Sequence, residues 1–221
     1  IGEASLVVSG EINAADFEFI AEKMTSLTSL DLSGASIVAY SGNPILLGRT
    51  DYVANSLPAY AFAGTSIESI ALPNTLTAIE EGAFSTSRLK SISIPSSVTA
   101  IGVGAFSNCD ELTSVTIPST VSSLGSHAFV DCDKLATVEL GVTTINASTF
   151  ARCISLKSVT AVSLAEIGEN AFSGCGALEE FVFASSLKTI GNSAFQASGL
   201  KSIDFSASES LDSIGAWAFA K

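Results

Sequence analysis

Apolar residues recur along the chain in one spaced pattern, at the first, fourth and sixth positions of a short segment. The pattern is clearest at Leu89, Ile92 and Ile94. Its other members are Leu27/Leu30/Leu32, Ile67/Ile70/Leu72, Leu112/Val115/Ile117, Leu135/Val138/Leu140, Leu178/Phe181/Phe183 and Leu200/Ile203/Phe205, with Leu156/Val159 lacking the third member. The last two apolar positions are two residues apart, which is the period of a strand with one buried face. Each segment therefore predicts a short strand, and Pro73, Pro95 and Pro118 end three of them.

A second apolar pair follows each predicted strand, as at Val98 and Ile101, and predicts a second short strand. A glycine such as Gly102 comes next, which suits a corner that needs a positive φ or a close backbone approach. The segment closes on a phenylalanine, predicted to reach the core from a turn of helix. These phenylalanines stand at 62, 84, 106, 129, 150, 172, 195 and 219, and so lie 21 to 24 residues apart. A repeat of this length predicts a solenoid.

The first 26 residues depart from the repeat and predict a cap made of a strand and a helix. Leu6 to Val8 is prone to form a strand, and Asn13 suits a helix N-cap, with Asp16 in the first turn. Apolar residues of the next segment fall on one helical face, at Phe17, Ile20, Ala21 and Met24. Because the first layer of a solenoid would otherwise lie open, residues 1–26 are interpreted as its cap and 27–221 as the repeats.

Residues 38–53 form an insertion with turn residues and charges of both signs. Insertions in solenoids map to loops on one face, often the binding face, and tyrosine is enriched at interfaces. Tyr40, Arg49, Asp51 and Tyr52 are therefore candidate partner-binding residues. The alternative, slightly favoured, is a lid that packs apolar residues over the first repeats, namely Ile45, Leu46 and Leu47.

Composition and charge narrow the classes of function. Apolar residues make up 47% of the chain and mean hydropathy is +0.48, yet no window offers the roughly 18 uninterrupted apolar residues of a membrane span. The net charge is −12 and the pI about 4.3. Since nucleic-acid sites need a basic patch and anionic lipid repels an acidic protein, neither is an expected partner.

Four cysteines each lie three residues after a repeat phenylalanine, at Cys109, Cys132, Cys153 and Cys175. Equivalent positions in consecutive coils point the same way, which is poor geometry for a disulfide. We interpret them as a buried ladder of free thiols, in preference to the disulfides that an exported protein would allow. No C-x-x-C pair or neighbouring histidine completes a zinc site.

Catalysis and metal binding have little support in the sequence. His127 is the one histidine, stands at a variable position expected at the surface, and has no nominated nucleophile or orienting partner. Acidic pairs such as Asp110-Glu111 could collect Ca²⁺ in neighbouring coils, but a solvated acidic edge is the preferred interpretation. We expect no enzymatic activity, no metal and no cofactor.

Stacking the predicted strands places polar residues in columns on one face of a sheet. Ser93, Thr116, Glu139 and Thr160 follow one another in such a column and are candidate partner-binding residues. Small hydroxyls also simply suit a crowded parallel sheet. Aromatic rings, which sugar sites commonly use, are missing from these positions in the sequence, and this weakens the case for a glycan.

The repeat unit L-x-x-I-x-I-P-x-x-V-x-x-I-G-x-x-A-F-x-x-C-x-x-L resembles the BspA-like class of leucine-rich repeats of bacterial surface proteins, over roughly residues 54–221. Departures are local: Asn146 replaces the glycine, Thr149 replaces the alanine, and proline is missing after Pro118. The resemblance implies an α/β fold, a right-handed leucine-rich-repeat solenoid rich in β-structure, with short helical turns and an N-terminal helical cap. It also implies export and non-enzymatic adhesion or binding at the cell surface.

The functional prediction is therefore a surface module, expected to be monomeric, that binds a host or matrix protein or a glycan. A structural spacer that presents another domain is the alternative. The chain begins at Ile1 without a leader, so we expect an export signal to have been removed; it ends at Lys221 within a repeat, so we expect either further chain or a shortened final repeat.

Overall fold

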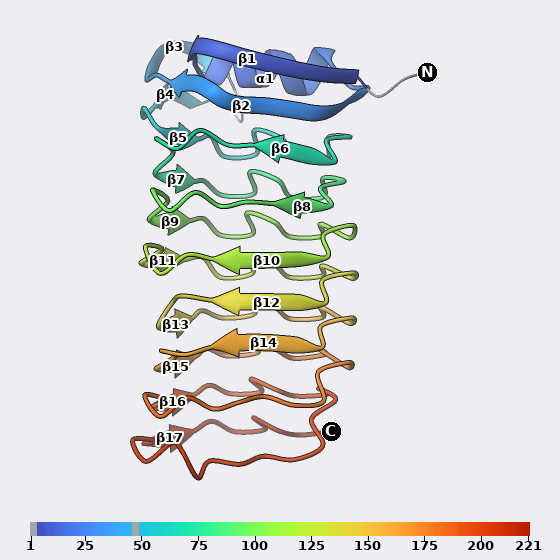
Figure 1. Cartoon of the computed structure of the whole chain (residues 1–221), viewed down its shortest axis with the longest axis vertical. Helices are drawn as coiled ribbons and strands as arrows, with labels where there is room; N and C mark the ends of the chain where they lie inside the picture. Colours follow the sequence, from blue (N-terminus) through green and yellow to red (C-terminus); the bar gives the residue numbers. More distant parts are fainter. Residues whose placement is uncertain (1–3, 46–48) are drawn as a thin grey trace.

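The protein is a stack of parallel coils closed at one end by a strand and a helix (Figure 1). A computed structural model describes residues 4–45 and 49–221. The cap consists of β1 (Ala4–Ile12) and α1 (Ala14–Lys23). Two parallel sets of short strands then run along the stack, as the repeat pattern predicts, and the leucine-rich-repeat solenoid is confirmed.

The first strand of each coil builds one set. It comprises β2 (Leu27–Ile37), β6 (Ser69–Ala71), β8 (Ser91–Ile92), β10 (Ser114–Ile117), β12 (Thr137–Leu140) and β14 (Ser158–Ala161). These strands form two sheets, in the orders β1-β2-β6-β8 and β10-β12-β14. Pro118 directly follows β10, as expected of a residue that cannot donate to a ladder.

The second strand of each coil builds the other set. It comprises β5 (Ser56–Leu57), β7 (Ala78–Ile79), β9 (Ala100–Ile101), β11 (Ser123–Leu124), β13 (Thr144–Ile145), β15 (Glu166–Ile167), β16 (Thr189–Ile190) and β17 (Ser213–Ile214). Their order is β5-β7-β9-β11 and β13-β15-β16-β17. Within the insertion, β3 (Tyr40–Ile45) and β4 (Arg49–Tyr52) form an antiparallel pair.

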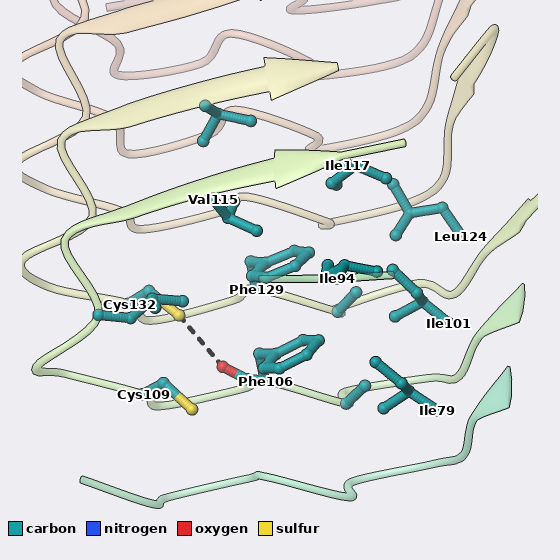
Figure 2. Close-up of a cluster of buried hydrophobic side chains, with 14 of the residues drawn as sticks. Ile79, Ile94, Ile101, Phe106, Cys109, Val115, Ile117, Leu124, Phe129 and Cys132 are labelled. Atoms are coloured by element: carbon teal, nitrogen blue, oxygen red, sulfur yellow. Dashed lines mark hydrogen bonds between the residues drawn. The ribbon is translucent and has the colours of Figure 1, made fainter. Parts of the chain in front are cut away.

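The core is a column of repeated side chains. Phe62, Phe84, Phe106, Phe129, Phe150, Phe172 and Phe195 are all buried. Phe106 and Phe129 stack with their ring centroids 4.9 Å apart and their planes 4° from parallel, and Figure 2 shows both rings among Ile94, Ile101 and Val115. The column begins at the cap, where Phe17 of α1 meets Phe62 edge-on at 5.7 Å. One apolar stack therefore runs through cap and repeats.

The cap helix forms as its sequence predicts. Asn13 is the N-cap: its side chain accepts a hydrogen bond from the Ala15 backbone N–H, and the Asp16 carboxylate accepts one from the Asn13 N–H, completing a capping box. The strand before it is longer than the predicted Leu6–Val8 run, because β1 pairs with β2 along most of its length.

The glycine corners are explained by close approach and not by a positive φ. A Cβ on Gly125 would lie 2.4 Å from the Gly102 carbonyl carbon of the previous coil, and one on Gly102 would lie 2.5 Å from the Glu81 nitrogen. Positive φ occurs two residues after the corner instead, at Gly104 (59°) and His127 (59°). At the corner itself, Asn146 replaces glycine, and its side-chain amide donates to the Leu124 carbonyl.

Two details of the predicted coil differ. The phenylalanines stand on hydrogen-bonded turns in place of helical turns: the Phe106 N–H, for example, donates to Ala128 of the next coil. The strands predicted at Leu178–Phe183 and Leu200–Phe205 do not form regular strands. Phe183 packs there against Phe181 and Phe205, with ring centroids 4.9 and 4.7 Å apart. We attribute the lost ladder to these rings, since they occupy positions that hold smaller Val, Ile or Leu elsewhere.

Candidate functional site

The described part of the insertion is a hairpin that brings its four candidate residues together. Tyr40 is paired with Tyr52 across the two strands, their ring centroids 6.2 Å apart. The Arg49 guanidinium lies 5.0 Å from the centre of the Tyr52 ring. The hairpin therefore forms one small polar and aromatic cluster.

Contacts with the repeats fix this hairpin in place. Arg49 Nη1 donates to Glu80 Oε2 at 2.6 Å, and Ser56 Oγ donates to the other oxygen of Glu80 at 2.8 Å. The hydrogen bond to Glu80 also raises the pKa of Arg49. The Glu80 carboxylate thus connects the hairpin to the first coils.

The four hairpin residues differ in their availability to a partner. Asp51 is exposed, and hydrogen bonds from Ser41 and Thr50 lower the pKa of its carboxyl group. Tyr52 has only 5% of its surface exposed, and burial raises the pKa of its hydroxyl. Tyr52 therefore offers little surface to a partner, and its role in partner binding stays a prediction. The interpretation as a lid remains a prediction, because Leu46, Leu47 and the Ile45 side chain lie outside the described residues.

The second group of candidates lies on the face of β10, β12 and β14. The strand register places Thr116 beside Glu139 and Glu139 beside Thr160, and all three side chains are exposed. Thr116 Oγ1 donates to Glu139 Oε2 at 3.1 Å. Ser93, also exposed, belongs to the preceding coil. The polar column predicted from the sequence is therefore present.

A second polar column runs beside the first on the same strands. The register aligns Ser114 with Thr137 and Thr137 with Ser158, and these side chains too are exposed. We call the six residues of both columns on β10, β12 and β14 the strand face: Ser114, Thr116, Thr137, Glu139, Ser158 and Thr160. It offers five hydroxyls and one carboxylate to a partner. Val182, where the first column would continue, is exposed and apolar.

The hairpin and the strand face are separate surfaces. Figure 1 shows β3 and β4 beside the cap, several coils away from β10, β12 and β14. Arg49 and Ser56 bind Glu80, which follows a strand of the second set. The eight candidate residues thus divide into two groups, and a small ligand cannot contact both.

The cysteines form the buried ladder that the spacing predicts. All four are free and buried. Cys132 Sγ donates to the carbonyl of Phe106 in the previous coil at 3.1 Å, the bond dashed in Figure 2, and the other three make the equivalent contact at the same distance. Burial raises the pKa of Cys109 and Cys175 to about 12. Such thiols stay protonated and act as packing groups and weak donors.

His127 occupies an exposed, left-handed position. Its equivalents in other coils also have positive φ, as at Tyr60 (58°), Asn170 (54°) and Trp217 (61°). The sequence variation at this position therefore reflects a surface site with one backbone shape. No contact of His127 with a nucleophile or carboxylate is present in the described chain that would make it a catalytic base.

The acidic edge is built from ion pairs and hydrogen bonds. Arg152 binds the Asp131 carboxylate through two nitrogens. Lys134 donates to both oxygens of Glu111, which lowers the pKa of that carboxyl group. Burial, with Asp133 and Asp131 nearby, raises the pKa of Asp110. Among the described residues, no group of three or more His, Cys, Asp or Glu has the arrangement of a metal site.

One hollow was missed by sequence reasoning. It has a volume of about 540 Å³ and lies over β13, β15, β16 and β17. Gly168, Gly191 and Gly215 line it together with polar side chains such as Glu169 and Asn192. The lining residues come from four successive coils, so the hollow is visible only once the coils are stacked.

Comparison with known proteins identifies the repeat. The sequence matches the family described as "BspA type Leucine rich repeat region", in six copies, over residues 55–165 and 140–221. The chain belongs to the BspA-type leucine-rich repeat family. Proteins of this kind generally bind other proteins and are not typically enzymes. No curated protein matches the chain.

Solved structures of bacterial leucine-rich repeat proteins share the fold. One from Bacteroides ovatus is 28% identical, with a TM-score of 0.73, over 94% of this chain and 49% of that chain. TpLRR of T. pallidum is 26% identical, with a TM-score of 0.62, over 80% of this chain and 78% of that one. A protein from Eubacterium ventriosum, at 21% identity and a TM-score of 0.60 over 95% and 57%, shows the same fold. The chain spans about half the length of the B. ovatus protein.

A helix that spans a membrane must be long and largely apolar. Within residues 4–45 and 49–221, none of the helical structure is both long and apolar enough to span a bilayer.

Proposed function

We propose that this BspA-type protein is a non-enzymatic module of the cell surface that binds a host or matrix protein, or a glycan, through its strand face. The observation that supports this most is the exposed polar register of β10, β12 and β14, where Thr116, Glu139 and Thr160 lie side by side. Solenoids build extended surfaces of this kind, and a partner can meet many groups at once.

The chemistry of the strand face favours hydrogen bonding over charge. Its hydroxyls both donate and accept, and its one carboxylate, Glu139, already accepts from Thr116. A protein partner with backbone or amide groups suits this surface better than a strongly charged one. We further propose that the module acts as a monomer and that residues 1–26 cap one repeat domain, residues 27–221, with the insertion at about 38–53.

The hairpin is the second candidate surface. Tyr40 and Arg49 are half-exposed or exposed and Asp51 is exposed, while the contacts to Glu80 hold the loop in a defined position. A loop that is already fixed in one conformation loses little conformational entropy when it binds a partner, and this favours recognition. We propose that it contributes to binding a large partner or binds a separate one.

A screen against extracellular-matrix proteins and a glycan array tests the proposal with three variants. The first is Thr116→Lys/Glu139→Lys/Thr160→Lys on the strand face. The second replaces residues 41–51 by a short Gly-Ser link. The third, Thr143→Lys, is the control, because Thr143 is exposed beside β13 in the second strand set. Circular dichroism verifies that each variant is folded.

The outcomes separate the surfaces. Saturable binding that the strand-face variant loses and the control keeps supports the proposed site. Binding lost only in the hairpin variant moves the site to the insertion. If no immobilised protein or glycan is bound, the binding function is wrong for this domain and the structural spacer is the better account.

A further inference from the structure

The outer side of the cap has a free strand edge. β1 is the terminal strand of its sheet, and among the described residues no strand pairs with its outer edge. An edge strand presents unpaired N–H and C=O groups, and proteins commonly protect such edges with lysine or proline. β1 contains neither; its one charged residue is Glu11. Register irregularities with β2 leave Ser5–Val7 and Ser9–Ile12 as regular stretches, so the edge suits a short added strand.

An apolar groove of about 290 Å³ lies between this strand and α1. β1 contributes Leu6 and Val8 to it, and α1 contributes Phe19 and Ile20, with Met24 at the C-cap of the helix. Phe19 is 60% exposed. A capping element ordinarily turns a polar face outward to keep the end of the solenoid soluble. Capping the solenoid therefore does not explain why this groove is apolar.

The charge around the groove indicates what could occupy it. Glu11 and Asp16 line the groove. Residues 4–24 contain four acidic residues and one basic residue, so their net charge is −3. The one base, Lys23, is already paired with Glu22 at 3.0 Å. A second copy of the cap would bring the same negative charge to the interface, which disfavours self-pairing and favours a basic partner.

From this combination we propose that the cap binds an extended, basic segment of a partner protein. The segment adds as a strand to the outer edge of β1, where backbone hydrogen bonds hold it. Its alternate apolar side chains enter the groove beside Phe19, because successive side chains of a strand point to opposite faces. Its Lys or Arg residues lie against Glu11 and Asp16. This site is independent of the strand face and of the function proposed for it.

Selection from a phage-displayed library of random ten-residue peptides tests this proposal. The library is first depleted on the Phe19→Ser protein and then selected on the wild-type protein. Phe19 is exposed, so the variant is expected to fold. Val182→Ser is the matched control, because Val182 is 79% exposed and lies far from the cap. Selected peptides are synthesised, and their affinities are measured by fluorescence polarisation, with and without N-methylation of alternate peptide nitrogens.

We expect peptides that alternate apolar and polar residues and carry Lys or Arg. Phe19→Ser should weaken them by at least about tenfold, since burying a phenylalanine is a large favourable term, and Val182→Ser should change nothing. Added salt should also weaken binding, and N-methylation on the edge-facing side should abolish it. Three results would overturn the proposal: no peptide prefers the wild-type protein, the selected peptides are acidic, or N-methylated peptides bind equally well. Concentration-dependent self-association in sedimentation, lost in Phe19→Ser, would also overturn it and assign the edge to a second copy.

Discussion

Adding one methyl group at Gly125 should destabilise the stack more than adding one at Gly104. The Cβ of Gly125→Ala would lie 2.4 Å from both the Gly102 carbonyl carbon and the Val103 nitrogen. Both are backbone atoms of the previous coil and cannot rotate away. An ordinary contact needs about 1 Å more, so the two coils must separate at this corner.

The separation weakens the local ladder, including the 2.7 Å bond from the Gly125 N–H to the Ile101 carbonyl. Overpacking costs about 1–3 kcal/mol and each lost hydrogen bond about 1 kcal/mol. We therefore expect Gly125→Ala to lower the free energy of unfolding by about 2–4 kcal/mol.

Gly104→Ala is the matched control. Its Cβ would lie 3.5 Å from the Ser107 Oγ, an ordinary contact, so the cost is that of the left-handed backbone alone. That cost is about 1–2 kcal/mol. Gly104→Asn should cost less than Gly104→Ala, because asparagine tolerates this conformation and Asn170 adopts it in an equivalent turn.

Urea unfolding followed by far-ultraviolet circular dichroism measures all three variants against the wild-type protein. The steric argument is refuted if Gly125→Ala loses less than about 1 kcal/mol of unfolding free energy, or if Gly104→Ala loses as much as Gly125→Ala.

Three further predictions concern the core and the cap. Phe129→Ala should cost about 3–5 kcal/mol, because the ring is buried in a continuous stack; urea unfolding of Phe129→Leu, expected to cost less, is the comparison, and equal losses would contradict it. The pKa of Cys109 and Cys175 is about 12 in the folded protein, so these thiols ionise at lower pH in the unfolded chain. The free energy of unfolding should therefore fall as the pH rises from about 9 towards 12, by about 1.4 kcal/mol per pH unit for each thiol. The double variant Cys109→Ala/Cys175→Ala should show a shallower fall, and an unchanged slope would refute the assignment. Asn13→Ala should lower the free energy of unfolding by about 1 kcal/mol, because the helix loses its N-cap. Asn13→Ser should retain most of this stabilisation, because serine is also a good N-cap.

The repeat made most of the fold predictable. Once Phe106 and Phe129 are known to be equivalent, every residue between them inherits a place in the coil, including Cys109, Thr116 and Gly125. The buried thiols and the polar column followed from this equivalence alone.

The structure could not be predicted from the sequence in segments that are not repeated, because no equivalent segment was there for comparison. Tyr52 lies in the unrepeated insertion, where it is buried and pairs with Tyr40 across the hairpin, so no equivalent position in another coil could predict its burial. The sequence correctly predicted that the corners require glycine. The choice between a positive φ and a close backbone approach as the reason depended on the position of the neighbouring coil. The cap groove was likewise hidden, since Leu6, Val8 and Phe19 meet only in three dimensions.

The proposed function requires the partner to bind the strand face. Surface plasmon resonance tests it most directly, with the wild-type domain, the triple lysine variant at Thr116, Glu139 and Thr160, and Thr143→Lys measured against the strongest partner from the screen. The three lysines would be buried when the partner binds and should weaken the complex at least about 100-fold. The affinity of Thr143→Lys should stay within about twofold of the wild-type value. Equal affinity of the triple variant and the wild-type domain would contradict the account.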